Sequence, residues 1–298
     1  NVFYPGSITA RSSLAATDKV STALILKSTA FLRTKGAGEW DGTLYGGVMH
    51  PNQEADVAGS DTTFINAAQY SNIRALQYAE AGIWQSVRWK RGNFLPVFKG
   101  IPAVTTAAAT AEKTQITATD GGGTIVSASN FKFKVVARDK TTDYERKISV
   151  TSADIASAAT GNNESFTFVM PSSTAYVYDI YMTVAGGAGS LFKVASRQAA
   201  SATVVITAVP AGTEAVAPVA PADQIEVFVA WVFGKGAFGR VELNGMSLAS
   251  YLTPPGASYS NPLAQGRKVG SKIMWKSFLI DIDFFVRLET ASTYGSLL

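Results

Sequence analysis

The chain of 298 residues contains no cysteine and only one histidine. The first absence excludes a disulfide framework and any thiolate metal site, and the second leaves very few options for imidazole chemistry. Charged residues make up only 16% of the chain, below the typical quarter, whereas 47% are hydrophobic. Much of the surface must therefore be neutral, which favours an assembly of subunits over a monomer.

Long hydrophobic runs are also missing. No stretch approaches the roughly 18 uninterrupted apolar residues of a membrane-spanning helix, so we expect no membrane association. The net charge is +4, and residues 101–221 are neutral, with nine basic and nine acidic side chains. Such a small positive excess permits weak, non-specific contact with a polyanion but is not typical of a dedicated nucleic-acid-binding protein.

The first hundred residues mix helical and strand patterns. A helix is predicted over 18–35, capped by Thr17 or Asp18 and ended by Gly36. A strand follows over 43–49 and closes at His50-Pro51-Asn52, a second helix is predicted from about 61 to 80, and a further strand starts at Gly82. This order predicts an α+β fold.

Composition changes at Ile101, where a segment rich in Ala, Thr, Ser and Val begins. Alternating runs such as FKFKVVARD and AYVYDIYMTV, separated by Gly, Asn and Pro, predict an inserted all-β sandwich of the immunoglobulin-like type over 101–221. The proline-rich run that ends at Pro221 is interpreted as a return linker. The host fold would then comprise residues 1–100 and 222–298.

The closing stretch carries the clearest strand pattern in the chain. Apolar residues occupy every even position from Phe278 to Leu288, and Ser277, Asp281, Asp283, Arg287 and Glu289 stand at odd positions. We therefore expect one long strand with a buried face that includes Ile282, so that Ile282→Asp would prevent assembly by destabilising the sheet. The opposite, polar face carries Asp281, Asp283 and Arg287.

Several patterns suggest chemistry but have a simpler interpretation. Gly234–Gly239 fits G-x-G-x-x-G, yet no helix start follows it, so we expect a tight turn between strands. His50 with Asp56 could form a base and its orienting carboxylate, although a turn histidine bonded to the backbone is favoured. The aromatic runs at Tyr176–Tyr181 and Phe228–Phe233 could line a ligand groove but are more typical of a sheet core.

Two charged sets remain as candidate sites. Arg88-Trp89-Lys90-Arg91 combines cations with an aromatic ring, as single-strand nucleic-acid binders do, but the cluster is short and an intersubunit contact is favoured. Asp281 and Asp283 have a spacing that could serve glycoside hydrolysis or a cation, although a solvated face near other subunits is favoured. We therefore expect no catalytic residue, no cofactor and no metal site, with Arg88, Trp89, Lys90, Arg91, Asp281, Asp283 and Arg287 as candidate intersubunit contacts.

Four segments in order carry a family resemblance: YGGVMHPNQEADV (45–57), AAQYSNIRALQYAEAGIWQSVRWKRGNFLPV (67–97), VFVAWVFGKGAFGRVEL (227–243) and NPLAQGRKVGSKIMWKSFLIDIDFFVRLE (261–289). Together they resemble the major capsid proteins of tailed bacteriophages, in the subgroup that includes podophages similar to coliphage N-four. The resemblance implies a Hong Kong 97-type fold with axial and peripheral domains. Residues 1–100 would be mainly axial, 101–221 an outward-facing insertion, and 222–298 the closing strands of the peripheral domain.

The resemblance also implies a function. The chain would self-assemble as hexamers and pentamers into an icosahedral phage head around double-stranded DNA, in the virion, after assembly in the host cytoplasm. Cement or decoration proteins and weak, non-specific contact with packaged DNA would accompany it. An alternative class is a surface adhesin whose immunoglobulin-like module binds carbohydrate.

Residues 1–17 cannot supply the amino-terminal arm, extended loop and spine helix that the resemblance implies. Proteolytic processing, an incomplete sequence or a second chain would account for this.

Overall fold

The chain folds as a mainly β protein. A computed structural model describes residues 1–60, 65–66, 80–126, 128–158, 163–184, 186–242, 249–253, 268–272 and 275–295. The described residues are 42% strand and 12% helix, and their α-helices are α1 (Thr22–Thr34) and α2 (Pro51–Ser60). The predicted α+β fold of the Hong Kong 97 type is therefore wrong, because alternating β-branched and aromatic residues form strands through most of the chain.

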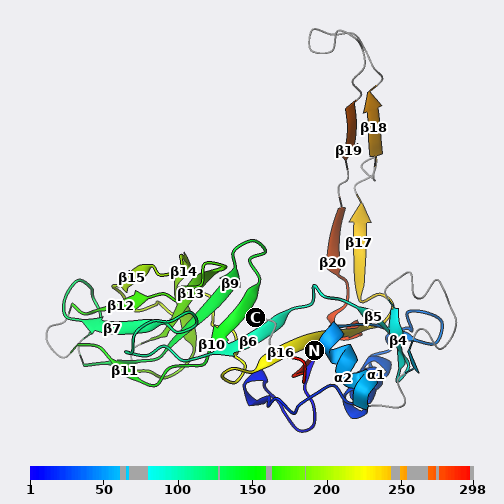
Figure 1. The fold of residues 1–298 in the computed structure, drawn as a ribbon, viewed down its shortest axis with the longest axis horizontal. Helices are drawn as coiled ribbons and strands as arrows, with labels where there is room; N and C mark the ends of the chain where they lie inside the picture. Colours follow the sequence, from blue (N-terminus) through cyan, green and yellow to red (C-terminus); the bar gives the residue numbers. More distant parts are fainter. Residues whose placement is uncertain are drawn as a thin grey trace.

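The largest sheet has 12 strands and continues through both parts of the body (Figure 1). Antiparallel pairing dominates, but β10–β6, β2–β5 and β1–β21 are parallel. Its path runs through β14 (Leu191–Gln198), β13 (Tyr176–Thr183), β9 (Phe133–Asp139), β10 (Glu145–Ser149), β6 (Val97–Ile101), β16 (Glu226–Phe233), β2 (Tyr45–Met49), β5 (Val87–Arg91), β4 (Glu80–Trp84) and β3 (Ile65–Asn66), while β21 (Phe285–Thr290) pairs with β16 and with β1 (Val2–Phe3).

A second sheet faces the β14–β10 half of the first. It consists of β15 (Thr203–Ile206), β12 (Ser165–Val169) and β7 (Gln115–Thr119), with the short pair β8 (Asn130–Phe131) and β11 (Ile155–Ala156) beside it. A core rich in phenylalanine fills the space between the sheets, where Phe133 contacts the rings of both Phe166 and Phe168 edge-on. Residues 101–221 thus form two packed sheets, and β10–β6 pairing joins them to the rest.

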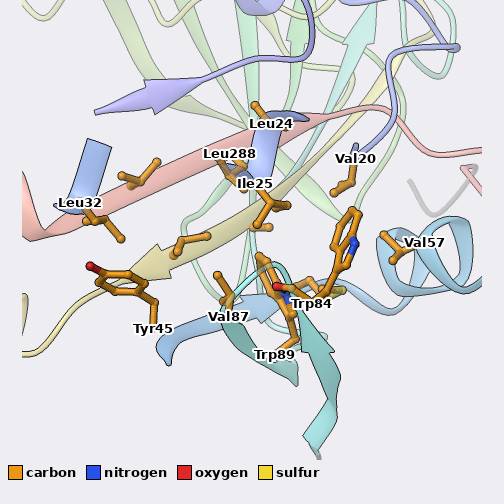
Figure 2. Packing of buried hydrophobic residues seen from close by; sticks show 14 of the residues in the cluster. Val20, Leu24, Ile25, Leu32, Tyr45, Val57, Trp84, Val87, Trp89 and Leu288 are labelled. Carbon is orange, nitrogen blue, oxygen red and sulfur yellow. Dashed lines mark hydrogen bonds between the residues drawn. The ribbon is translucent and has the colours of Figure 1, made fainter. Parts of the chain in front are cut away.

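The other half has its own core, which Figure 2 shows from close by. Helix α1 places Leu24, Ile25 and Leu32 against the sheet, where Trp84 and Trp89 are also fully buried. The helix begins later than predicted, because the Ser21 hydroxyl rather than Thr17 or Asp18 accepts the hydrogen bond from the Leu24 amide (3.4 Å). Gly36, with φ of +74°, follows its end as predicted.

Two further predictions need correction. Residues 80–91 form a hairpin, β4 and β5, rather than one strand, because Gln85 and Ser86 both adopt positive φ, as a two-residue turn between strands requires. Helix α2 begins directly at Pro51, where the sequence predicted only a turn. The helix predicted over 61–80 lies almost wholly outside the described residues.

The closing stretch is not one strand. It forms β20 (Trp275–Leu279), a 3-10 turn (Ile282–Phe284) and β21, and Ile282 is 62% exposed rather than buried. The chain leaves one sheet and joins another here, because β20 pairs only with β17 (Phe238–Glu242), whereas β21 pairs with β16. Only the second half, with Val286 and Leu288 fully buried, has the predicted inward face.

Candidate functional site

A two-stranded ribbon of β17 and β20 projects from the body, as Figure 1 shows in yellow and red-brown. The pair β18 (Ala249–Thr253) and β19 (Lys268–Lys272) lies further out along it. Among the residues that the structure describes, neither strand of the β17–β20 pair is hydrogen-bonded to a third strand. An isolated two-stranded ribbon is marginally stable in water, so such a ribbon ordinarily needs something to pack against.

Large apolar side chains are exposed on both faces of this ribbon. The register pairs Phe238 with Leu279 on one face, and Trp275, 55% exposed, lies further out on that face with the Arg240 guanidinium 5.2 Å from its ring centroid. Alternation places Val241 and Phe278 on the other face. A strand pair with one buried and one solvated face would carry polar residues on the solvated face. The ribbon differs from that pattern, because large apolar residues lie on both of its faces.

A trough lies where the ribbon meets the large sheet. Its apolar part encloses about 490 Å³, and an adjoining part of about 330 Å³ shares Phe233 and Phe238 with it and carries charged residues. The rings of Phe233 and Phe238 contact each other edge-on with centroids 4.9 Å apart. The apolar part is lined by Val48, Trp231, Phe233, Phe238, Ser277, Phe278, Leu279 and Phe285, and the charged part by Trp40, Asp41, Gly46, Gly47, Arg88, Lys90, Phe233 and Phe238.

The structure separates the four residues of the predicted basic cluster. Arg88 and Lys90 face the trough, and Arg88 forms an ion pair with Asp41. Trp89 is fully buried in the core, so it contributes no surface. Arg91 is bound through both guanidinium arms to Glu54 of α2, at 2.7 and 2.8 Å. Strand alternation explains this division, and only Arg88 and Lys90 lie at the trough.

Asp281, Asp283 and Arg287 serve contacts within the chain. The Asp281 carboxylate accepts a hydrogen bond from the Asp283 amide at 2.8 Å and so caps the 3-10 turn. Asp283 forms an ion pair with Lys35 at 3.0 Å, which lowers the pKa of that carboxyl. Arg287 lies in a largely buried cluster, 2.5 Å from the Glu289 carboxylate, and desolvation lowers the pKa of its guanidinium. No shared acidic face is formed.

The other candidates behave as the simpler interpretations predicted. Gly234–Gly239 forms the turn from β16 to β17, and Gly236 has φ of +86°. The His50 ring accepts a hydrogen bond from the Asn52 amide at 3.2 Å, and burial lowers its pKa, while Asp56 bonds to Thr293 instead. Tyr178, Tyr181 and Phe228 are buried in sheet cores, as the core interpretation predicted, whereas Trp231 and Phe233 of the second aromatic run also line the apolar part of the trough.

Sequence reasoning missed the ribbon because it assigned Phe278 and Ile280 to a buried face. A usable signal was present: apolar residues stand at both odd and even positions of 275–280, which the alternation of a half-buried strand does not permit.

No protein-family model matches the chain, and no curated protein matches it. Among the described residues, no helix has the length and hydrophobicity needed to cross a membrane.

Proposed function

We propose that the protein is a structural, non-enzymatic subunit whose ribbon and trough are covered by further copies of the same chain in a closed shell. The observation that carries the proposal is the ribbon with large apolar side chains exposed on both faces. A second copy is the favoured occupant, because the low charge of the whole chain fits a subunit that is enclosed by its neighbours. The resemblance to tailed-phage major capsid proteins suggests that the closed shell is a virion head that encloses DNA.

The trough supports this proposal because it offers two kinds of contact side by side. Its apolar part suits side chains such as those of the ribbon, and its charged part, with Arg88 and Lys90, suits an acidic or polar segment. Interfaces commonly combine an apolar centre with a charged rim. Stable interfaces remove about 800 Å² from each partner, an area that several large side chains on each face of the ribbon can supply.

A matched pair of valines tests the proposal. Val241 on the ribbon and Val205 on β15 are 55% and 51% exposed, and both lie on strands. We expect Val241→Lys to weaken self-association at least about tenfold, because a lysine replaces an apolar contact worth about 1.5 kcal/mol. Val205→Lys should leave association unchanged. Sedimentation velocity over a range of concentrations, with negative-stain electron microscopy of the same samples, measures the effect.

A chain that stays monomeric at every concentration would refute self-assembly. Equal weakening by both lysine variants would show that the ribbon is not the contact surface. A general effect on folding is excluded by comparing the thermal unfolding of the two variants, which should match because both valines are half exposed in the single chain.

A further inference from the structure

Glu164 presents an electrostatic problem at the start of β12. Its side chain is fully buried, yet neither carboxylate oxygen has a hydrogen-bond partner among the residues that the structure describes. Buried carboxylates are normally paired, hydrogen-bonded or bound to a metal, because an isolated buried charge is costly. The backbone of Glu164 is fixed by two hydrogen bonds to Ile125. The Glu164 amide donates to the Ile125 carbonyl oxygen (3.1 Å), and the Ile125 amide donates to the Glu164 carbonyl oxygen (3.3 Å).

The sheet register places a second carboxylate next to it. Ser165 pairs with Thr119 in the antiparallel β12–β7 ladder, so the next positions outward, Glu164 and Asp120, lie opposite each other. Residues directly opposite in such a ladder have Cβ atoms about 5 Å apart and point to the same face. That face is the inner one, which carries Phe166 and Ile116. Asp120 itself is exposed, so the pair lies at the open end of the sandwich.

A glycine loop covers this end. Gly121 and Gly122 have φ of +82° and +78°, and the Ser165 hydroxyl donates a hydrogen bond to the Gly121 carbonyl oxygen at 2.9 Å. At Gly123 a Cβ atom would lie 2.0 Å from the Glu164 carbonyl oxygen, so no other residue fits there. Because Gly121, Gly122 and Gly123 have no side chains, the loop adds no positive charge beside Glu164.

The electrostatic surroundings of Glu164 oppose its ionisation. Desolvation raises the pKa of the Glu164 carboxyl, and repulsion from Asp120 raises it further. An acid whose pKa is raised on folding holds its proton more tightly in the folded state, so the stability of the fold falls as pH rises above the ordinary value of 4.5. A bound cation would remove this penalty at neutral pH.

We propose that Glu164 and Asp120 bind a hard divalent cation such as Ca²⁺ at the end of the β-sandwich. The described residues contain no group of three or more histidine or acidic side chains that could hold a metal. The remaining ligands would therefore be oxygen atoms of the glycine loop and water, which Ca²⁺ accepts readily. With two carboxylates the site is a weak one, with a Kd of about 10⁻⁴ to 10⁻³ M. The sequence predicted no metal site, because two acidic residues 44 positions apart form no motif.

Thermal unfolding of the full chain at neutral pH tests the site. We expect about 10 mM CaCl₂ to raise the Tm by about 3–6 °C relative to a sample in chelator. Isothermal titration calorimetry with CaCl₂ should give one site. Glu164→Gln should raise the Tm in chelator, since it removes the unpaired charge, and should abolish both the Ca²⁺-induced shift and the binding heat.

Two further variants separate the site from general ion effects. Asp120→Asn should weaken binding about tenfold or more without unfolding the protein, because Asp120 is exposed. Asp154→Asn, which changes an exposed carboxylate paired with Lys132 in the same half of the molecule, should keep the full response. The absence of a Ca²⁺ response in the wild-type chain would overturn the proposal. A response that persists in Glu164→Gln would overturn it as well.

Discussion

Asp179 is the most heavily bonded acidic residue of the sandwich. Its carboxylate is buried and accepts hydrogen bonds from Arg138 Nε (2.8 Å), Lys193 Nζ (2.8 Å) and the Arg197 amide (2.9 Å). Burial acts to raise its pKa, but these three donors outweigh burial and lower it. The contrast with Glu164 is instructive, because both acids are buried and only the bonding partners set the direction of their pKa shifts.

We predict that Asp179→Asn destabilises the fold by about 2–4 kcal/mol, because it leaves the partly buried Lys193 without its carboxylate partner and leaves Arg138 paired with Glu145 alone. Asp143→Asn is the matched control: Asp143 pairs with Arg197 but both side chains are more than half exposed, so its loss should cost about 0–1 kcal/mol. Urea unfolding at pH 7 measures both.

Urea unfolding of wild type and Asp179→Asn at low pH tests whether the loss of stability comes from the lost charge. Because the pKa of Asp179 is lowered on folding, its contribution is present above the ordinary value of 3.8 and is lost as pH falls below it. The difference between wild type and Asp179→Asn should therefore shrink from pH 5 to pH 2. A difference that stays constant would show that the effect is one of packing rather than of charge.

At the scale of the element, the closing stretch shows why periodicity alone misplaced a buried face. Every even position from Phe278 to Leu288 is apolar, but the Asp281 carboxylate caps a 3-10 turn in the middle of this stretch. A turn changes the direction of the chain without changing the sequence pattern. The residues before it belong to the ribbon, and those after it belong to the large sheet.

We predict opposite outcomes for two aspartate variants of this stretch. Val286→Asp should destabilise the chain by several kcal/mol, because it places an unpaired charge in the core, whereas Ile282→Asp should change stability by less than about 0.5 kcal/mol. This replaces the expectation from the sequence that Ile282→Asp destabilises a sheet. Thermal and urea unfolding of both variants measure the change in stability. A large loss of stability in Ile282→Asp would contradict the exposed position of Ile282 in the single chain.

At the scale of the whole molecule, the predicted insertion is physically continuous with the rest. The entering and leaving segments run side by side, since Gly100 donates to the Ile225 carbonyl and accepts from the Gln224 amide, both at 2.9 Å. A Cβ atom on Gly100 would lie 1.8 Å from the Ala222 carbonyl oxygen, so this crossing requires glycine. A third core, which includes Phe98, Val136 and Val229, extends across the junction.

We predict that residues 101–221 unfold cooperatively when expressed alone, and that a fragment starting at Val97 is more stable by about 5–10 °C. The longer fragment keeps β6, which pairs with β10, and with it Phe98, which packs against Val136 and Ile148. Circular dichroism during heating of both fragments measures the gain. Equal Tm values would show that β6 contributes nothing to the module, and loss of cooperativity in both would show that the sandwich depends on the whole sheet.

The sequence by itself determined the positions of many strands and the glycine turn after β16. It also determined that Tyr178, Tyr181 and Phe228 are buried in the core. These depend on local alternation and on backbone conformations that only glycine adopts freely, so they are visible in a single segment.

Only the tertiary structure decided which alternating face is buried, that Arg88 and Lys90 but not Trp89 reach a surface trough, and that Asp120 lies across from Glu164. Each of these depends on pairing between residues far apart in the chain. The pairing of strands far apart in the chain also decided the fold class, because the described residues are mainly strand. Long-range hydrogen bonding and packing override local preference, which is why the apolar ribbon and the acidic pair emerged only in three dimensions.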